Sequence, residues 1–156
     1  MHVNERDVGW KNYDTPETEF RRKELSNAVE SEKLGCSLYE LSPGERSWPY
    51  HYHTANEEAI FVLAGTGQIR TPDGHSDLRE GDFLSFPADE RGGHRVINDS
   101  DDTLRYLAVS TMQEPDVTIY PDEEKFGVFV GSPPGGREQR SFEGYYPTDA
   151  ETDYWE

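Results

Sequence analysis

Two histidines and a glutamate near the middle of the chain have a spacing that could bind a metal ion. They lie in the run His51-Tyr52-His53-Thr54-Ala55-Asn56-Glu57-Glu58. Alternate side chains of a strand share a face, so His51 and His53 point the same way, and Glu58 can join them from the next strand after a short turn. Imidazole nitrogens and a carboxylate oxygen bind borderline divalent ions such as Zn, Fe, Mn, Ni or Cu. The run therefore predicts a site for one divalent metal ion, whose identity the residues leave open.

Glycines and a third histidine extend this pattern along the chain. The first group begins at Gly44, contains the two histidines and Glu58, and ends at Gly65. The second group runs from Gly81 through Pro87 to His94 and Asn98. Together and in this order, the two groups resemble the paired motifs of the cupin superfamily, in particular its small single-domain prokaryotic members. The resemblance covers residues 34–111.

The resemblance implies a ligand set of His51, His53, Glu58 and His94. Six residues separate Glu58 from Gly65, which matches the motif and selects Glu58 over Glu57. Adjacent strand residues face opposite sides, so we expect Glu57 to face solvent. The second group departs from the motif, because its loop 88–93 is two residues longer.

Short strands broken by Gly, Pro and Asp turns predict an all-β fold, a sandwich or barrel. The resemblance makes this a cupin-type β-barrel, also called a double-stranded β-helix or jelly roll. We expect strands near 35–41, 48–53, 59–63, 68–71, 76–79, 82–86, 94–98, 104–111, 117–120 and 127–130.

The organisation along the chain follows from these strands. Residues 1–33 are polar and predict an N-terminal arm, with a short helix considered around 16–26. Residues 34–131 form the barrel. Residues 132–156 form an irregular acidic tail with aromatic side chains, which we expect to pack on the barrel or on a partner subunit.

The composition excludes some classes of partner. The net charge of −17 argues against nucleic acid, whose phosphates need clustered Lys and Arg, and against anionic membranes. An N-terminal apolar stretch and a membrane-length segment are both absent, so a cytoplasmic location is expected. The single cysteine, Cys36, lies in an expected strand, where we interpret it as a small buried residue and not a nucleophile.

The charge also predicts salt-dependent stability. Acidic residues outnumber basic ones by 32 to 15, and only four of the basic residues are lysines. Such surfaces resemble those of proteins from salt-loving organisms, and high salt screens the repulsion among like charges. The melting temperature should therefore rise between dilute buffer and molar salt, as followed by circular dichroism. An equal melting temperature in both would contradict a halophilic protein.

The segment Ala59-Ile60-Phe61-Val62-Leu63 is apolar on both faces. One face fills the barrel, and the other must be covered by a sheet, an arm or another subunit. This favours a homodimer.

A pocket beside the metal would bind a small-molecule ligand. Trp48, Tyr50 and Tyr52 alternate with the ligand face and are assigned to packing. Candidate lining residues are Tyr39, Phe86, Arg95 and Tyr106, and Arg46 or Arg95 could hold a carboxylate. Two function classes stay open: a metal-dependent oxygenase or isomerase, and a non-catalytic, sugar-like binding or sensing protein.

Overall fold

The fold is built almost entirely of β-strands, as the sequence predicts. The computed structural model describes residues 1–136 and 139–156, so Arg137 and Glu138 of the expected tail lie outside it. The strands are β1 (Lys11–Thr15), β2 (Thr18–Glu24), β3 (Leu34–Leu41), β4 (Tyr52–His53), β5 (Glu58–Ala64), β6 (Thr66–Thr71), β7 (Gly74–Arg79), β8 (Phe83–Phe86), β9 (Arg95–Ile97), β10 (Leu104–Thr111), β11 (Asp116–Tyr120), β12 (Lys125–Val130) and β13 (Phe142–Pro147). The helical turns are η1 (Glu5–Asp7), α1 (Leu25–Ala28), η2 (Glu90–Gly92) and η3 (Pro121–Glu123). None of the helices in the described ranges is long and apolar enough to span a membrane.

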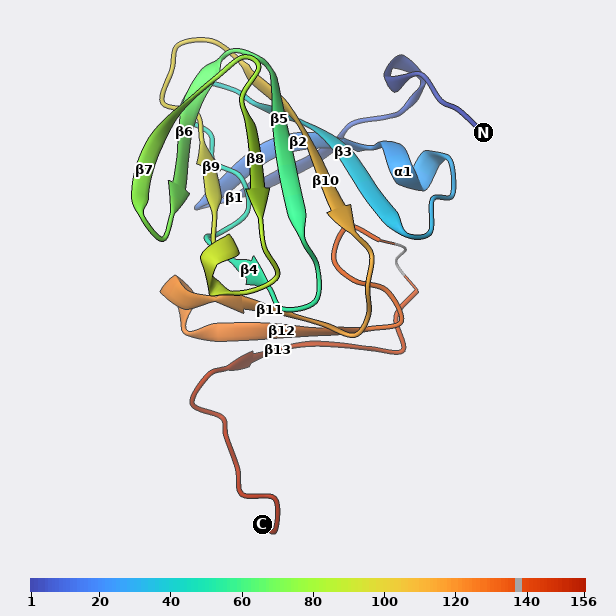
Figure 1. The fold of residues 1–156 in the computed structure, drawn as a ribbon, viewed down its shortest axis with the longest axis vertical. Helices are drawn as coiled ribbons and strands as arrows, with labels where there is room; N and C mark the ends of the chain where they lie inside the picture. The colour runs from blue at the N-terminus through green and yellow to red at the C-terminus, as the bar shows by residue number, and fades with distance from the viewer. Residues whose placement is uncertain (137–138) are drawn as a thin grey trace.

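Three groups of strands surround one core (Figure 1). A six-stranded group has the order β1-β2-β3-β10-β5-β8, and β7-β6-β9 forms a three-stranded group. The core side chains come from both of these groups and include Tyr39, Ile60, Ile69, Val96 and Tyr106. A third group, β13-β12-β11-β4, crosses one end of the other two. This arrangement leaves the metal-ligand candidates at the end that the third group closes.

The N-terminal arm is a β-hairpin, and the helix considered around residues 16–26 is wrong for most of that range. β1 pairs with β2, and β2 pairs with β3, so the hairpin extends the six-stranded group. Along β2, Thr18, Phe20 and Lys23 are buried, while Glu19 and Arg21 are exposed. Phe20 packs in the core, and its ring stacks on Tyr13 with a centroid distance of 4.7 Å. Burial of alternate residues against β3 fixes the segment as a strand.

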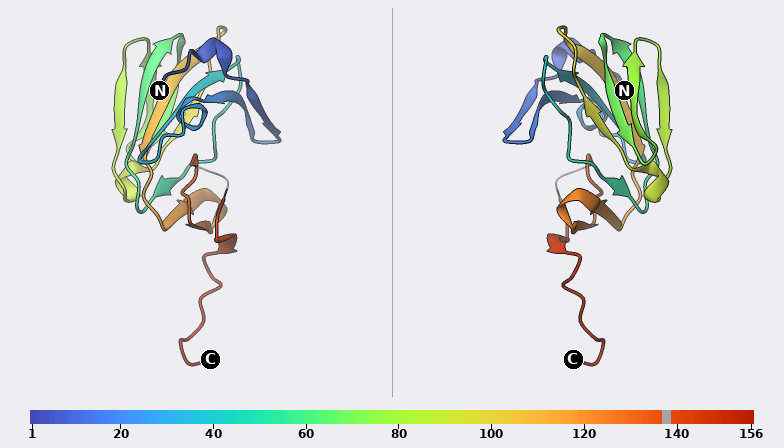
Figure 2. Two further views of the ribbon diagram at one scale, coloured as in Figure 1. Left: turned by 90° about the vertical axis from the view of Figure 1, so that its right-hand side faces the viewer. Right: turned by 90° about the vertical axis from the view of Figure 1, so that its left-hand side faces the viewer.

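The C-terminal segment, expected to be irregular, contains β13. This strand pairs with β12 in register from Val130↔Phe142 to Lys125↔Pro147. The last residues then leave the body of the molecule and project away from it (Figure 2). Trp155 in this projection is 88% exposed.

Candidate metal centre

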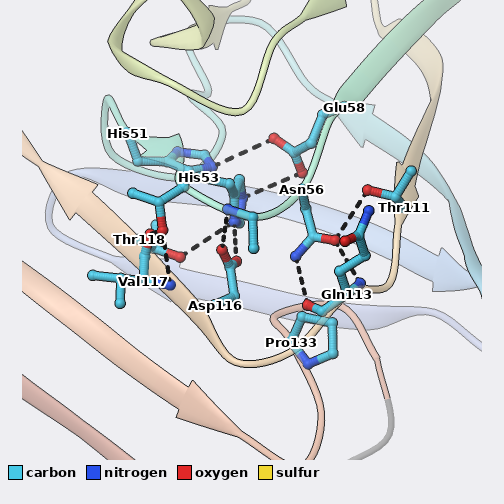
Figure 3. A network of polar contacts seen from close by, with 12 residues as sticks. His51, His53, Asn56, Glu58, Thr111, Gln113, Asp116, Val117, Thr118 and Pro133 are labelled. Carbon is cyan, nitrogen blue, oxygen red and sulfur yellow. Dashed lines mark hydrogen bonds and ion pairs between the residues drawn. The ribbon is translucent and has the colours of Figure 1, made fainter.

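The four expected metal ligands converge at the end of the barrel that β4 and β11 close. Nε2 of His53 lies 3.4 Å from Oε1 of Glu58, and Nε2 of His51 lies 3.8 Å from Oε2. Nε2 of His94 lies 3.4 Å from the same Oε2. Ligand atoms of His51, His53 and Glu58 all fall within 4.8 Å of one another. Figure 3 shows the Glu58 carboxylate facing the rings of His51 and His53.

Backbone pairing brings these side chains together from three places in the sequence. His51 forms an isolated antiparallel bridge with His94, and its N–H lies 3.4 Å from the His94 carbonyl. His53 on β4 is paired with Thr118 on β11. Glu58 is the first residue of β5 and pairs with β8 on one side and β10 on the other. The centre therefore depends on the closed arrangement of strands and not on a single loop.

The other ring nitrogen of each histidine is also engaged. Nδ1 of His51 lies 2.8 Å from the Pro49 carbonyl, and Nδ1 of His94 lies 2.9 Å from the Gly92 carbonyl. A carbonyl oxygen can only accept, so Nδ1 carries the proton in both rings. The Nε2 atoms then present lone pairs toward Glu58, which is the tautomer that binds a metal.

His53 is oriented by a carboxylate that the sequence analysis missed. Its Nδ1 lies 2.6 Å from Oδ2 of Asp116, which is completely buried. The other oxygen of Asp116 accepts a hydrogen bond from the Ala55 N–H at 3.0 Å. A carboxylate behind a metal-binding imidazole fixes the ring and raises its basicity. Asp116 lies 63 residues from His53, and no local pattern in the sequence indicates this pairing.

The donor set fits a divalent cation, as the unpaired oxygen of the Glu58 carboxylate indicates. Its Oε2 is buried and has no hydrogen-bond partner among the described residues. The groups nearest to it are Nε2 atoms whose protons lie on Nδ1, so lone pairs face lone pairs. A divalent cation bound among these atoms would satisfy the Glu58 oxygen and the imidazole lone pairs that face it. Three imidazoles and one carboxylate are the residues that would hold it.

Burial and charge tune the protonation of the ligands. Burial, with the neighbouring imidazoles, lowers the pKa of His51 to about 3, and burial also lowers the pKa of His94. Burial acts in the same direction on His53, but Glu58 and Asp116 outweigh it and raise the pKa of His53 to about 10. Burial would raise the pKa of Glu58, yet the surrounding imidazoles hold it well below its usual range. A metal bound at Nε2 of His53 would displace the proton held there.

The turn between β4 and β5 selects Glu58 over its neighbour. Glu57 is exposed and accepts a hydrogen bond from the Ser85 hydroxyl at 3.0 Å, so it points away from the ligands. Buried Asn56 fixes the turn, because its Oδ1 accepts from Gln113 N–H at 2.7 Å and its Nδ2 donates to the Gln113 carbonyl at 2.9 Å (Figure 3). The same contacts hold the segment that leads into β11 and Asp116.

The ligands open onto a cavity of about 350 Å³. Besides the four ligands, its lining includes aromatic side chains from several strands: Tyr39, Trp48, Tyr106, Tyr120, Phe129 and Tyr145. Charged side chains also reach it: Arg22, Lys125, Arg140 and Glu143. Burial raises the pKa of both Tyr106 and Tyr120, so their hydroxyl groups stay protonated and can donate hydrogen bonds.

Some of the expected lining residues occupy other places. Tyr39 and Tyr106 line the cavity, whereas Phe86 stacks directly on the His94 ring at a centroid distance of 3.8 Å. Arg95 is buried behind the cavity, and its guanidinium donates to the Glu17 carbonyl. Arg46 is exposed on the outside of the barrel. The two arginines therefore do not reach a ligand in the cavity.

The aromatic residues before His53 do not all face away from the ligands. Only Tyr52 and His53 form strand β4, so the expected strand 48–53 is wrong over its first half. Without strand alternation, Trp48 turns inward, where it lines the cavity and donates from Nε1 to the Tyr39 hydroxyl at 3.1 Å. Tyr50 is buried against Gly93, close to the ligand His94.

Asn98 has a structural role, and Cys36 is less buried than the sequence predicts. Asn98 is fully buried and structural, with Nδ2 donating to the carbonyls of Leu41 and Asp102 at 2.8 Å each. Cys36 is half-buried, and burial raises the pKa of its thiol, which keeps it unreactive as a nucleophile. Cys36 is one of the residues that line the cavity.

Comparison with known proteins agrees with this geometry. The family model described as "Cupin domain" matches residues 37–110. A candidate sugar phosphate isomerase from Acidithiobacillus ferrooxidans is 25% identical, with a TM-score of 0.78, 94% of this chain and 88% of that chain covered. A sugar phosphate isomerase of the cupin superfamily from Silicibacter pomeroyi is 21% identical, with a TM-score of 0.79 and coverages of 96% and 94%.

A third solved structure is similar over a shorter range. A polyketide cyclase from Streptomyces resistomycificus is 23% identical, with a TM-score of 0.61, 71% of this chain and 78% of that chain covered. The comparison with curated proteins gives no match. The matched domain contains all four ligands and the strands that carry them. Residues 37–110 are therefore similar to a cupin domain, the strands have a cupin-like arrangement, and the His and Glu cluster lies inside the matched region.

Proposed function

We propose that the chain is a metal-dependent isomerase that acts on a sugar phosphate. The observation that carries this proposal is the convergence of His51, His53, His94 and Glu58 at the floor of a polar, aromatic cavity. The two structures named as sugar phosphate isomerases support the choice of substrate. They match 94% and 96% of this chain and so include the terminal segments that line the cavity.

The cavity offers groups that bind and orient such a substrate. A bound divalent ion would act as a Lewis acid that polarises the sugar carbonyl and stabilises developing negative charge. The rings of Trp48 and Tyr145 offer apolar faces for the C–H groups of a sugar. The Tyr39 hydroxyl is held by donors from Trp48 and Arg22, so its own proton is free to reach a substrate hydroxyl. These residues bind and orient the substrate beside the ligands.

The decisive experiment is an aldose–ketose interconversion assay on protein loaded with Fe, Mn, Zn, Ni or Cu in turn. Conversion of an aldose phosphate to its ketose, followed by proton NMR without oxygen uptake, supports the proposal. Glu58→Gln, which removes a ligand, is the inactive control. Oxygen uptake with a substrate would instead favour an oxygenase, and tight sugar binding without turnover would favour a binding protein.

We also propose that the protein is a homodimer formed through the outer face of the six-stranded group. Phe61 on β5 and Phe83 on β8 are paired across the strands and are 42% and 65% exposed. Val109 on the adjacent β10 is 39% exposed, and Leu34 at the end of β3 is 62% exposed. An exposed apolar patch on so polar a chain indicates a covered surface, and a two-fold axis lets one patch cover its own copy.

Phe83→Asp should convert the dimer to a monomer, because each interface would bury two uncompensated carboxylates beside apolar side chains. Light scattering over a wide concentration range measures the mass. Phe142→Asp, at a residue that is 49% exposed on β13 and outside the six-stranded group, is the matched control and should leave the dimer intact. A wild-type protein that is monomeric at every concentration would contradict the dimer.

A further inference from the structure

The charge of the cavity is opposite to that of the chain. The whole chain has 15 Lys and Arg residues and 32 Asp and Glu residues. Among the residues that the structure describes, three of the basic residues but only two of the acidic residues line the cavity. The cations are Arg22, Lys125 and Arg140. One of the two carboxylates, Glu58, belongs to the ligand cluster, and the other, Glu143, is paired with Arg140 at 3.0 Å. A strongly acidic protein that gathers cations in one cavity is suited to an anionic ligand.

Two of these cations are already committed to the fold. Arg22 donates from Nε to the Tyr13 hydroxyl at 3.1 Å and from a terminal nitrogen to Glu24 at 2.7 Å. Arg140 donates to two backbone carbonyls, those of Ser132 at 2.8 Å and Pro133 at 3.0 Å, and also pairs with Glu143. Their guanidinium groups shape the walls of the cavity and would have to break several hydrogen bonds to reach a ligand.

Lys125 is differently placed. Its ammonium lies 5.3 Å from the ring centroid of Tyr120 and 5.8 Å from that of Tyr145, and both rings line the cavity. Its charged partner is the exposed Glu123 on the outside of the turn that joins β11 and β12. The side chain of Lys125 is 38% exposed, so its flexible stem can exchange Glu123 for a ligand at small cost.

The Tyr120 ring is a neighbour of both Lys125 and the metal-ligand candidate His51. Its centroid lies 5.9 Å from that of the His51 ring and 5.3 Å from the Lys125 ammonium, and all three residues line the cavity. A phosphorylated sugar has its carbonyl carbon at one end of a short carbon chain and its phosphate at the other. The carbonyl end can therefore meet the ligand cluster while the phosphate reaches β12.

We infer that Lys125 is the specificity-determining residue that binds the phosphate of the substrate, with Tyr120 and Tyr145 as the surface between the phosphate and the metal ligands. This inference rests on the proposed function for the identity of the substrate, but not for the anion site itself. On this inference, residues of the C-terminal strands distinguish a phosphorylated sugar from an unphosphorylated one. The barrel supplies the metal ligands that meet the carbonyl end of the substrate.

The test compares Lys125→Gln with Lys33→Gln, which removes the same charge at an exposed lysine outside the cavity. Isothermal titration calorimetry measures the binding of inorganic phosphate to the metal-loaded and the metal-depleted protein. Loss of a charged hydrogen bond corresponds to a weakening of about 10–100-fold. We expect this loss for Lys125→Gln in both forms, near wild-type binding for Lys33→Gln, and recovery in Lys125→Arg.

The outcomes separate this inference from the proposed function. Phosphate that binds Lys125→Gln as tightly as the wild type, or that binds only when metal is present, would overturn the role of Lys125 and leave the isomerase proposal standing. Phosphate binding that depends on Lys125 in a protein without isomerase activity would support the anion site and reject the isomerase. In an active enzyme, Lys125→Gln should raise KM for the sugar phosphate and leave KM for the unphosphorylated sugar unchanged.

Discussion

Glu58→Gln should strip the protein of its metal, whereas Glu57→Gln should leave the metal content unchanged. Glu58 is the one carboxylate of the cluster that faces all three Nε2 atoms, at 3.4–3.8 Å. An uncharged amide is a weak ligand and cannot offset the charge of a divalent ion. The loss of affinity should therefore exceed the roughly 10–100-fold that follows removal of an outer-shell partner.

Elemental analysis of protein purified without a metal-affinity tag measures this effect directly. The two variants make the same chemical change one residue apart, so global charge and handling cancel in the comparison. The Glu57 side chain is exposed and bonded to Ser85, so its replacement should cost only that surface contact. If Glu57→Gln lost its metal and Glu58→Gln kept it, Glu57 and not Glu58 would be the metal ligand.

The convergence of His51, His53 and Glu58 could be predicted from sequence because their spacing follows a short-range rule, whereas His94 was expected only from the resemblance to cupins. His51 and His53 are two residues apart and share a side of the chain, even though only Tyr52 and His53 have regular strand geometry. Glu58 faces inward because β5 starts at that residue and alternates from there, with Ile60 and Val62 buried on the same face. Small irregularities in the backbone therefore do not change which side of the chain these side chains share.

The N-terminal hairpin could not be recognised in the same way. β2 is rich in charged residues, and its only large apolar side chain is Phe20, so local composition gave a weak helical signal. The segment is a strand because β3 offers it an edge and because Glu5 accepts a hydrogen bond from buried Lys23 at 2.6 Å. β3 and Glu5 both lie outside residues 18–24, so the local sequence of this segment does not reveal either contact.

Lys125 and Trp48 illustrate a second limit. Lys125 lies between the expected strands 117–120 and 127–130, and the crossing of β11 and β12 over the end of the barrel brings it to the cavity. Trp48 lines the cavity because the backbone before β4 is not a regular strand. The alternation rule for strands therefore predicts the wrong side for this side chain. Residues that line a cavity from several chain segments depend on tertiary packing, and their roles follow only from the assembled structure.

Asp116 is the residue whose loss should reveal this long-range organisation most clearly. Its carboxylate is completely buried, and burial alone would raise its pKa. The hydrogen bond from His53 and the backbone N–H of Ala55 outweigh burial and hold the pKa of Asp116 below its ordinary value. Asp116 is therefore charged when it meets Nδ1 of His53, and it keeps Nε2 of that ring directed at the ligand cluster.

Asp116→Asn should therefore weaken metal binding by about 10–100-fold, although Asp116 does not touch the metal position. The asparagine keeps the size of the side chain, but its neutral oxygen makes the imidazole less basic, and its amide can turn a donor toward Nδ1. Competition with a chromophoric chelator measures the affinity. Asp122→Asn, the same change at an exposed carboxylate paired with Arg70, should leave the affinity unchanged. Equal affinity in Asp116→Asn and wild type, with both folded by circular dichroism, would mean that His53 is held in place by backbone pairing to Thr118 alone and that Asp116 serves only the fold.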